Sequence, residues 1–454
     1  MRTKDMKTHT TILRILGLSI LVSTAVCFSS DKKMDINTDT LIGTYTTIAT
    51  ANYKDTIKDA ENLEKAINNF AKKPTQENLE RSKKAWLNAR ESYGTSEIFR
   101  LSNGPIDAEE GWVAEAYGSL EPQINAWPLD ENMIDYTIDA NGKKTSGNII
   151  DTKGDFNPGG EESKVINVDT ISVEAITALN ENGGAANVAT GYHAVEFLLW
   201  GQDQDYSNFM KDSITKGAMK AGERPLSDFT SDKYAQRRLS YLKAASSKLV
   251  TDLKKVASGW SPNISKDCSV NFEGCYRGAI NHLLTGADAK KNITKNEALK
   301  QILSGMGVFI KSEIANERIA VAVLTPSEED EPSCFSDNTH RDIVTAYQGF
   351  KNVLTGRYKD IQGKSFLDKV DAKTKKKIRK LMASIEKRID SINTVAVTKA
   401  HFDYQIRPDN PQARVIVTLK NKMRKLGDMM LIIAKQNGVD LTSEDVTNLD
   451  ETQL

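Results

Sequence analysis

The segment IRKLMASIEKRIDSI, residues 378–392, has the apolar pattern from which the fold class can be predicted. Its apolar residues are separated by 3, 4, 4 and 3 positions and are Ile378, Leu381, Ile385, Ile389 and Ile392. That spacing places them on one side of an α-helix. A second set repeats the pattern with steps of 4, 3, 4 and 3: Leu419, Met423, Leu426, Met430 and Ile433. Helices with one apolar face bury it against other helices, so both stretches predict a helical bundle.

Further helices are expected along most of the chain. Apolar periodicity indicates them in residues 40–71, from Thr75 onward, and in residues 231–258 and 295–323. Alternation with a period of two is absent over comparable lengths, so β content should be minor. Residues 141–162 are rich in glycine and predict a long loop or a small hairpin excursion. The expected class is all-α, with two helical-bundle domains, 36–260 and 261–454.

Composition excludes several classes of protein. The chain has 454 residues, of which 39% are hydrophobic and 27% charged, as in globular proteins. The 61 Lys and Arg residues balance the 61 Asp and Glu residues. A nucleic-acid-binding protein usually has a basic excess, so a nucleic-acid partner is not expected.

Residues 1–30 have the features of a secretory signal. Arg2, Lys4 and Lys7 precede a mostly apolar segment, residues 12–28. This pattern predicts a signal peptide and therefore export, to the periplasm or to the outer membrane or cell surface. Cys27 follows Ser-Thr-Ala-Val, where a bacterial lipoprotein carries its lipidated cysteine. Simple cleavage and a lipid anchor on Cys27 are both open.

Three cysteines remain beyond the signal. Disulfides form in the oxidising compartments that exported proteins enter. Cys268 and Cys275 are seven residues apart, and Cys334 is the third. A bridge between the first two is one expectation, but three cysteines allow three pairings.

The segment GYHAVEFLLWG, residues 191–201, has the strongest chemical signal. His193 and Glu196 are three positions apart, so a helix would place them on one face. Imidazole and carboxylate are both ligands for iron or zinc. The alternative is structural, because two polar groups in an apolar segment could satisfy each other.

Two further groups of residues could contribute to a site. Asp337 and His340 are also three apart and could add metal ligands, whereas Ser336 or Asp337 could instead cap a helix. Glu97 and Arg100 could pair with each other, and polar residues interrupt the apolar helix around 304–318. The residues expected to hold a charged ligand are Glu97, Arg100, Glu313 and Arg318.

With these segments in view, the chain resembles the imelysin family. Residues 191–201 carry that family's Gly-x-His-x-x-Glu signature, and the similarity continues at residues 86–100, 222–225, 304–318 and 333–342. The resemblance implies an exported bacterial protein of two helical domains that is linked to iron acquisition. It also implies a site between the domains, near His193 and Glu196.

Three functions follow from these observations. The first is a non-enzymatic iron-uptake protein that binds iron, zinc or an iron chelate, with metal ligands His193, Glu196, Asp337 and His340. The second is a zinc peptidase, which the family's history implies, with His193 as ligand and Glu196 as general base. The sequence lacks the His-Glu-x-x-His helix of zinc peptidases. The third is a cell-surface binding module whose polar cluster is structural.

Overall fold

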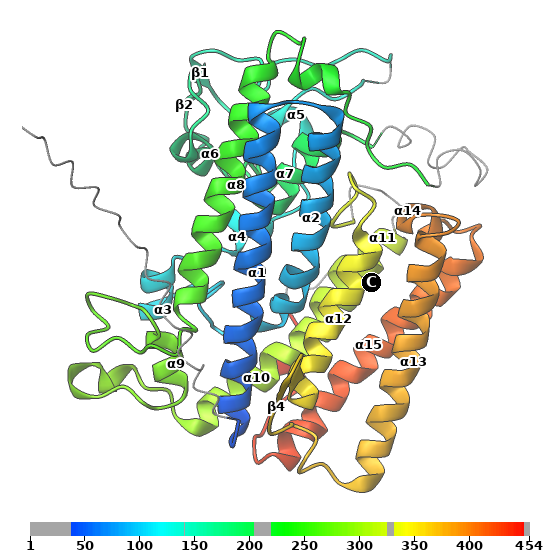
Figure 1. Ribbon diagram of the computed structural model, residues 1–454. Helices are drawn as coiled ribbons and strands as arrows, with labels where there is room; N and C mark the ends of the chain where they lie inside the picture. The colour runs from blue at the N-terminus through cyan, green and yellow to red at the C-terminus, as the bar shows by residue number, and fades with distance from the viewer. Residues whose placement is uncertain (1–37, 140, 204–218, 325–330, 449–454) are drawn as a thin grey trace, which may run out of the picture. The chain divides into compact units, whose positions relative to one another are not determined.

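The helices expected from apolar periodicity are present in the structure, a computed structural model (Figure 1). It describes residues 38–139, 141–203, 219–324 and 331–448. The predicted signal peptide and Cys27 lie outside these residues. None of the described helices combines the length and the apolarity needed to cross a membrane.

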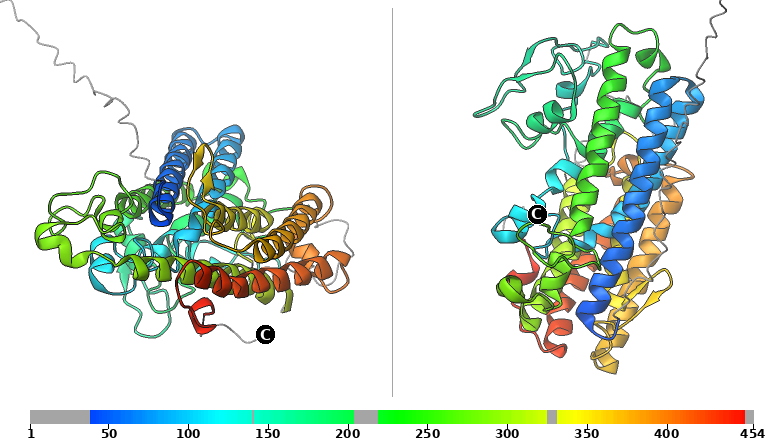
Figure 2. Two further views of the ribbon diagram at one scale, coloured as in Figure 1. Left: turned by 90° about the horizontal axis from the view of Figure 1, so that it is seen from below. Right: turned by 60° about the vertical axis from the view of Figure 1, so that its left-hand side comes forward.

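The first half of the chain packs around α1. This helix lies beside α2 and α8 in Figures 1 and 2, and the shorter α7 packs against α2, α4 and α8. Thr40 and Thr75 cap α1 and α2, since each side chain accepts a hydrogen bond from a backbone N–H of the first turn. The helices here are α1 (Leu41–Lys72), α2 (Gln76–Ser96), η1 (Glu97–Phe99), α3 (Gly111–Tyr117), α4 (Glu121–Asn125), α5 (Glu131–Ile134), α6 (Val173–Leu179), α7 (Gly191–Trp200), η2 (Leu226–Phe229) and α8 (Ala235–Ser258).

The second half packs around α15, which contacts α10, η4 and α13. Helix α12 packs against α13 and also against α2, so it joins the two groups of helices (Figure 1). The domain boundary at residues 260/261 stays a prediction. The helices here are α9 (Cys275–Ile280), η3 (Gly286–Lys291), α10 (Lys295–Val308), η4 (Phe309–Ala320), α11 (Val321–Leu324), α12 (Thr339–Thr355), α13 (Ala372–Ala396), α14 (Phe402–Ile406), α15 (Pro411–Gln436) and η5 (Glu444–Val446).

The apolar faces read from the sequence are the buried faces. All five residues of the set in α15 are buried. In α13 four of the five are buried, and Met382 takes the buried position next to the half-buried Leu381. The chain leaves α15 through Gly438, whose φ of +87° suits glycine. Periodicity therefore located the core of these helices to within one residue.

β structure in the described residues is limited to short antiparallel pairs, which confirms the all-α class. Strand β1 (Asp155–Phe156) pairs with β2 (Ile166–Asn167), with Asp155 opposite Asn167. Strand β3 (Arg357–Tyr358) pairs with β4 (Ile361–Gln362). The first pair begins inside the expected excursion, residues 141–162, and ends just beyond it. The expected bridge between Cys268 and Cys275 is also present.

The segment 295–323 is helical as expected, although η4 within it is a π-helix with wider turns. One local expectation was wrong. Neither Ser336 nor Asp337 caps α12. Its first flanking residue is Asn338, which makes no side-chain cap bond. Ser336 instead donates to Glu196, and Asp337 has a φ of +55° and contacts His401.

Candidate functional site

Helix α7 places His193 and Glu196 in contact. Gly191 begins the helix with a φ of +83°, and a Cβ there would come within 2.5 Å of the Ile124 carbonyl oxygen. Glycine is therefore needed for α7 to pack against α4. His193 Nδ1 lies 2.9 Å from Glu196 Oε2, and both side chains are buried. The expectation that the two residues share one helix face is confirmed.

Glu196 also holds the turn that precedes α12. Its Oε1 accepts a hydrogen bond from the Ser336 backbone N–H at 2.9 Å and another from the Ser336 hydroxyl at 2.6 Å. The signature in α7 is thus attached to a segment 140 residues further along the chain. Both carboxylate oxygens of Glu196 are occupied by these contacts.

The surroundings of this pair favour its neutral forms. Burial raises the pKa of Glu196 to about 8, although the bonds from Ser336 and the charge of Arg90 oppose the shift. Burial also holds the pKa of His193 well below its usual range, and the positive charges of Arg90 and Arg318 lower it further. His193 Nε2 is buried and has no hydrogen-bond partner in the described part of the chain. Two nearby guanidinium groups make Nε2 a poor position for a cation.

The four residues expected to hold a charged ligand form one ion-pair network. Arg318 donates to both carboxylate oxygens of Glu97, at 2.9 and 2.7 Å, and to Glu313 at 2.8 Å. Arg100 donates to Glu313 at 3.0 Å and lies 3.4 Å from Glu121. The two arginines outweigh the effect of burial and lower the pKa of Glu313 to about 2.

Glu97 and Arg100 do not pair with each other, which corrects the expectation from their spacing. The short helix η1 ends at Phe99, and Arg100 continues in extended backbone, with a ψ of 169°. This change of direction separates the two side chains, and each finds its partner in η4 instead. The charged groups of this network are therefore paired with one another, and the pairs join segments that are distant in sequence.

A second network joins α2 to α12. Arg90 Nε donates to Asp342 Oδ1 at 3.1 Å, and its Nη2 lies 3.0 Å from the same oxygen. The Ser333 hydroxyl donates to the other Asp342 oxygen at 2.5 Å. Arg90 also contacts Asn125, whose amide donates to Glu97. All of these side chains are buried, so the two networks form one connected polar layer.

A group of three buried aspartates lies next to the Ser336 turn. Each of Asp203, Asp337 and Asp403 has one carboxylate oxygen that lies within 4.8 Å of the corresponding oxygens of the other two. They come from the segment after α7, from the turn before α12 and from α14. At an effective dielectric constant of about 20, two full charges at that distance repel by about 3.5 kcal/mol. Such a group is chemically suited to a metal ion.

Two histidines accompany Asp337. His401 Nδ1 contacts the Asp337 carboxylate, and His340 Nδ1 lies 3.0 Å from the Asp337 backbone carbonyl oxygen. Of the expected metal ligands, the structure thus pairs His193 with Glu196 and places Asp337 in the adjoining turn and His340 in the first turn of α12.

Sequence reasoning missed Asp203 and Asp403. Two signals were available: Asp203 lies two residues after the signature segment, and Asp403 lies two residues after His401.

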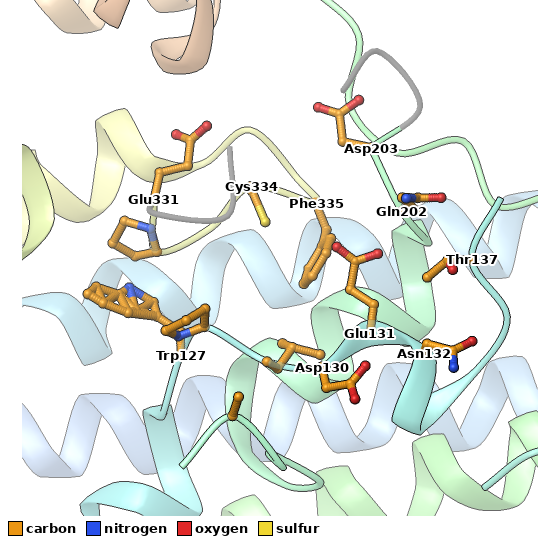
Figure 3. A pocket seen from close by; sticks show the side chains of 14 residues that line it. Trp127, Asp130, Glu131, Asn132, Thr137, Gln202, Asp203, Glu331, Cys334 and Phe335 are labelled. Carbon is orange, nitrogen blue, oxygen red and sulfur yellow. The ribbon is translucent and has the colours of Figure 1, made fainter. Parts of the chain in front are cut away.

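A cavity of about 400 Å³ opens beside this group (Figure 3). Asp203, Glu331, Trp127 and Phe335 are among its lining residues. Burial raises the pKa of Glu331 well above its usual range, and the negative charges of Asp403 and Asp203 add to the shift. Asp203 thus belongs to the aspartate group and, with Glu331, also lines the cavity.

Comparison with known proteins agrees with this arrangement of helices. Iron-regulated protein A of Synechococcus elongatus (strain ATCC 33912 / PCC 7942 / FACHB-805) is 23% identical over 325 residues, which are 72% of this chain and 66% of that protein. The matched region thus spans just under two thirds of that relative's length. A crystal structure described as an iron-regulated protein A precursor from Parabacteroides distasonis ATCC 8503 has 17% identity and a TM-score of 0.59. It covers 87% of this chain and 94% of that one, and at this identity it shows the fold alone.

The sequence profile of the imelysin family, peptidase M75, matches residues 49–428. That range includes the signature in α7, the Arg90–Asp342 pair, the aspartate group and most of α15. The resemblance seen in the sequence is confirmed, and the chain belongs to the imelysin family.

Proposed function

We propose that this chain is an exported protein of bacterial iron uptake that binds a metal ion or a metal-bearing ligand and does not cleave peptides. The site lies where α7 meets the turn before α12, around His193, Glu196, Asp337 and His340. The observation that carries the proposal is the group of buried carboxylates at this turn. Carboxylate oxygens that lie this close together are suited to binding one metal ion.

The link to iron and to export rests on relatives and on the N-terminal segment. Both similar proteins carry the name iron-regulated protein A, and one is described as a precursor. Residues 1–30 have the charge and apolar pattern of a secretory signal. We therefore place the protein in the periplasm or at the outer membrane or cell surface. A lipid anchor on Cys27 is one way in which it would be held there.

The zinc-peptidase alternative receives less support from the geometry. A general base must face the metal-bound water, but both oxygens of Glu196 are already used by His193 and Ser336. Zinc would also need about three protein ligands, and His193 offers only Nε2, near two guanidinium groups. The polar cluster around His193 is better suited to holding the two segments together.

Metal analysis and titration of residues 31–454 test the proposal. Element analysis after purification, followed by calorimetry with Fe²⁺, Fe³⁺ and Zn²⁺, should show about one bound ion per chain. Binding should weaken in the double variant His193→Ala/Glu196→Ala and stay unchanged in His282→Ala, which alters an exposed histidine.

Two results would count against the proposal. Failure of the wild-type chain to bind any of the three ions would contradict metal binding. Peptide cleavage by the wild type that disappears in Glu196→Gln, with the fold intact, would instead establish the peptidase.

A further inference from the structure

We propose that Asp203, Asp337 and Asp403 bind one hard cation, ferric iron in this setting, and that His193 and Glu196 position this site without touching the ion. The inference rests on the proposed function and deepens it, because it assigns the ligands. In this inference the Gly-x-His-x-x-Glu signature positions the metal ligands and does not itself bind the metal.

The spacing of the aspartates fits a single ion. Carboxylate oxygens bind hard cations at about 2.0–2.6 Å, so two ligand oxygens of one ion lie no more than about 5 Å apart. The three oxygens here lie within 4.8 Å of one another. An all-oxygen set of this charge favours hard cations such as Fe³⁺, Mn²⁺ or Ca²⁺ over softer ions.

Glu331 supplies the second, independent observation. Its side chain is only 2% exposed, and neither carboxylate oxygen has a hydrogen-bond donor in bonding geometry among the described residues. The nearby Thr339 hydroxyl lowers the pKa of Glu331, but its effect is smaller than that of burial, and the pKa stays well above its usual range. In Figure 3 the carboxylates of Glu331 and Asp203 are directed toward the same side of the cavity. A buried carboxylate without a donor is costly, and a bound cation would compensate it.

His401 and the cavity complete the surroundings. The ring of His401 contacts Asp337, and such a contact to a ligating carboxylate fixes the orientation of the carboxylate. The cavity of about 400 Å³ borders both Asp203 and Glu331. It gives an ion a route to the carboxylates and leaves room for water molecules that complete the coordination.

The signature is connected to the aspartate group through Ser336, the residue before Asp337. Glu196 accepts both hydrogen bonds that Ser336 donates, and Asp337 follows directly with a φ of +55°. That backbone conformation is uncommon for a residue with a side chain, and the surrounding contacts must maintain it. Holding Ser336 in place therefore sets the direction of the Asp337 carboxylate. His193 in turn orients Glu196.

The ligand assignment is tested by titrating residues 31–454 with Fe³⁺ supplied as citrate, and with Tb³⁺ as a second hard cation. Asp403→Asn and Asp203→Asn keep the side-chain shape and remove one charge each. We expect both to weaken binding at least tenfold. Asp409→Asn, whose side chain is 62% exposed, is the matched control and should stay within twofold of the wild type. If an aspartate variant fails to fold by circular dichroism, Glu331→Gln replaces it, with the same expected loss.

The positioning role is tested by two variants of Glu196. Glu196→Gln keeps an oxygen that can accept from Ser336 and, like the protonated Glu196, carries no charge, so binding near neutral pH should stay within about threefold of the wild type. Glu196→Ala removes the acceptor and should weaken binding at least tenfold. If Glu196 were a ligand, the two variants would lose binding equally.

The outcomes separate the two proposals. Binding that is lost in His193→Ala and Glu196→Gln but kept in Asp203→Asn and Asp403→Asn would overturn this inference and leave the proposed function standing. A wild-type chain that binds neither Fe³⁺ nor Tb³⁺ would overturn the inference, and lack of binding to Fe²⁺ and Zn²⁺ as well would overturn the proposed function.

Discussion

A few buried charged residues restrict how the helices of this protein can pack. Arg90, Arg318, Glu97 and Asp342 are almost completely buried, and each is paired with an opposite charge. Burying a charge is tolerated only when the partner and further hydrogen bonds replace the lost water. These pairs therefore allow few alternative arrangements of the helices that carry them.

The raised pKa of Glu196 predicts a pH-dependent stability in the metal-free protein. Between pH 6.5 and 8 the folded chain keeps the Glu196 proton, because its pKa is about 8, while the unfolded chain has lost it. The folded state binds more protons in this window, so the free energy of unfolding falls as the pH rises. We expect the wild type to lose about 1.5 kcal/mol more than Glu196→Gln does across this range. Urea denaturation at half-unit pH steps measures the difference.

His193 sets the lower limit of that window. Its pKa is lowered, so below about pH 6.5 it takes up a proton in the unfolded chain but not in the folded one. That contribution makes stability rise with pH and opposes the Glu196 effect. Identical slopes for wild type and Glu196→Gln between pH 6.5 and 8 would mean that Glu196 is ionised in the folded protein.

Removing Arg90 should be one of the most destabilising single changes. Arg90→Met leaves Asp342 buried with Ser333 but without its guanidinium, and breaking such a pair costs about 3–5 kcal/mol. Arg81→Met is the control, because the Arg81–Glu77 pair is exposed and should contribute less than about 1 kcal/mol. Chemical denaturation of both variants gives the comparison. A loss below about 1 kcal/mol for Arg90→Met would show that Asp342 is satisfied without it.

At the scale of elements, small residues bring α2 and α12 into contact. A Cβ at Gly94 would overlap the Thr345 side chain, and a Cβ at Gly349 would overlap the Thr95 carbonyl oxygen. The two helices can approach this closely only because both positions lack a side chain. This contact holds the Arg90–Asp342 pair in register, since the two residues lie on the same two helices.

Gly349→Ala should therefore destabilise the protein, although alanine favours an isolated helix by about 1 kcal/mol. The new methyl group meets backbone, which cannot move aside easily, so we expect a loss of about 1–3 kcal/mol. Gly184→Ala is a control, because the nearest atom to its Cβ would be 3.9 Å away. The melting temperatures of both variants are compared with that of the wild type. An unchanged or higher melting temperature for Gly349→Ala would contradict the close packing of α2 and α12.

For the whole molecule, metal binding should appear as added stability. An ion that binds only the folded state stabilises it by about 2.7 kcal/mol at a free concentration of one hundred times its dissociation constant. The wild type should melt at a higher temperature with Fe³⁺ citrate than with citrate alone, and a chelator should reverse the shift. Asp403→Asn should lose most of the shift, whereas Asp409→Asn should keep it. An equal shift in both variants would place the ion elsewhere.

The helices, their apolar faces and the proximity of His193 and Glu196 could be predicted from the sequence. Each depends on residues within a few positions of one another, for which helical periodicity settles which side chains share a face. The family could be predicted as well, through motifs that are contiguous in the chain. The pairing of Glu97 with Arg100 was wrong although it was equally local, because the chain changes direction at Arg100.

Contacts between residues that are distant in sequence could not be predicted and are seen only in the tertiary structure. Glu97 finds Arg318 across 221 positions, Arg90 finds Asp342 across 252, and Glu196 finds Ser336 across 140. No periodicity links such residues, because their distance depends on how the helices pack and where the connecting segments turn. The meeting of Asp203, Asp337 and Asp403 is of this kind. Helix packing brings these three residues together, because each aspartate lies on a different segment of the chain.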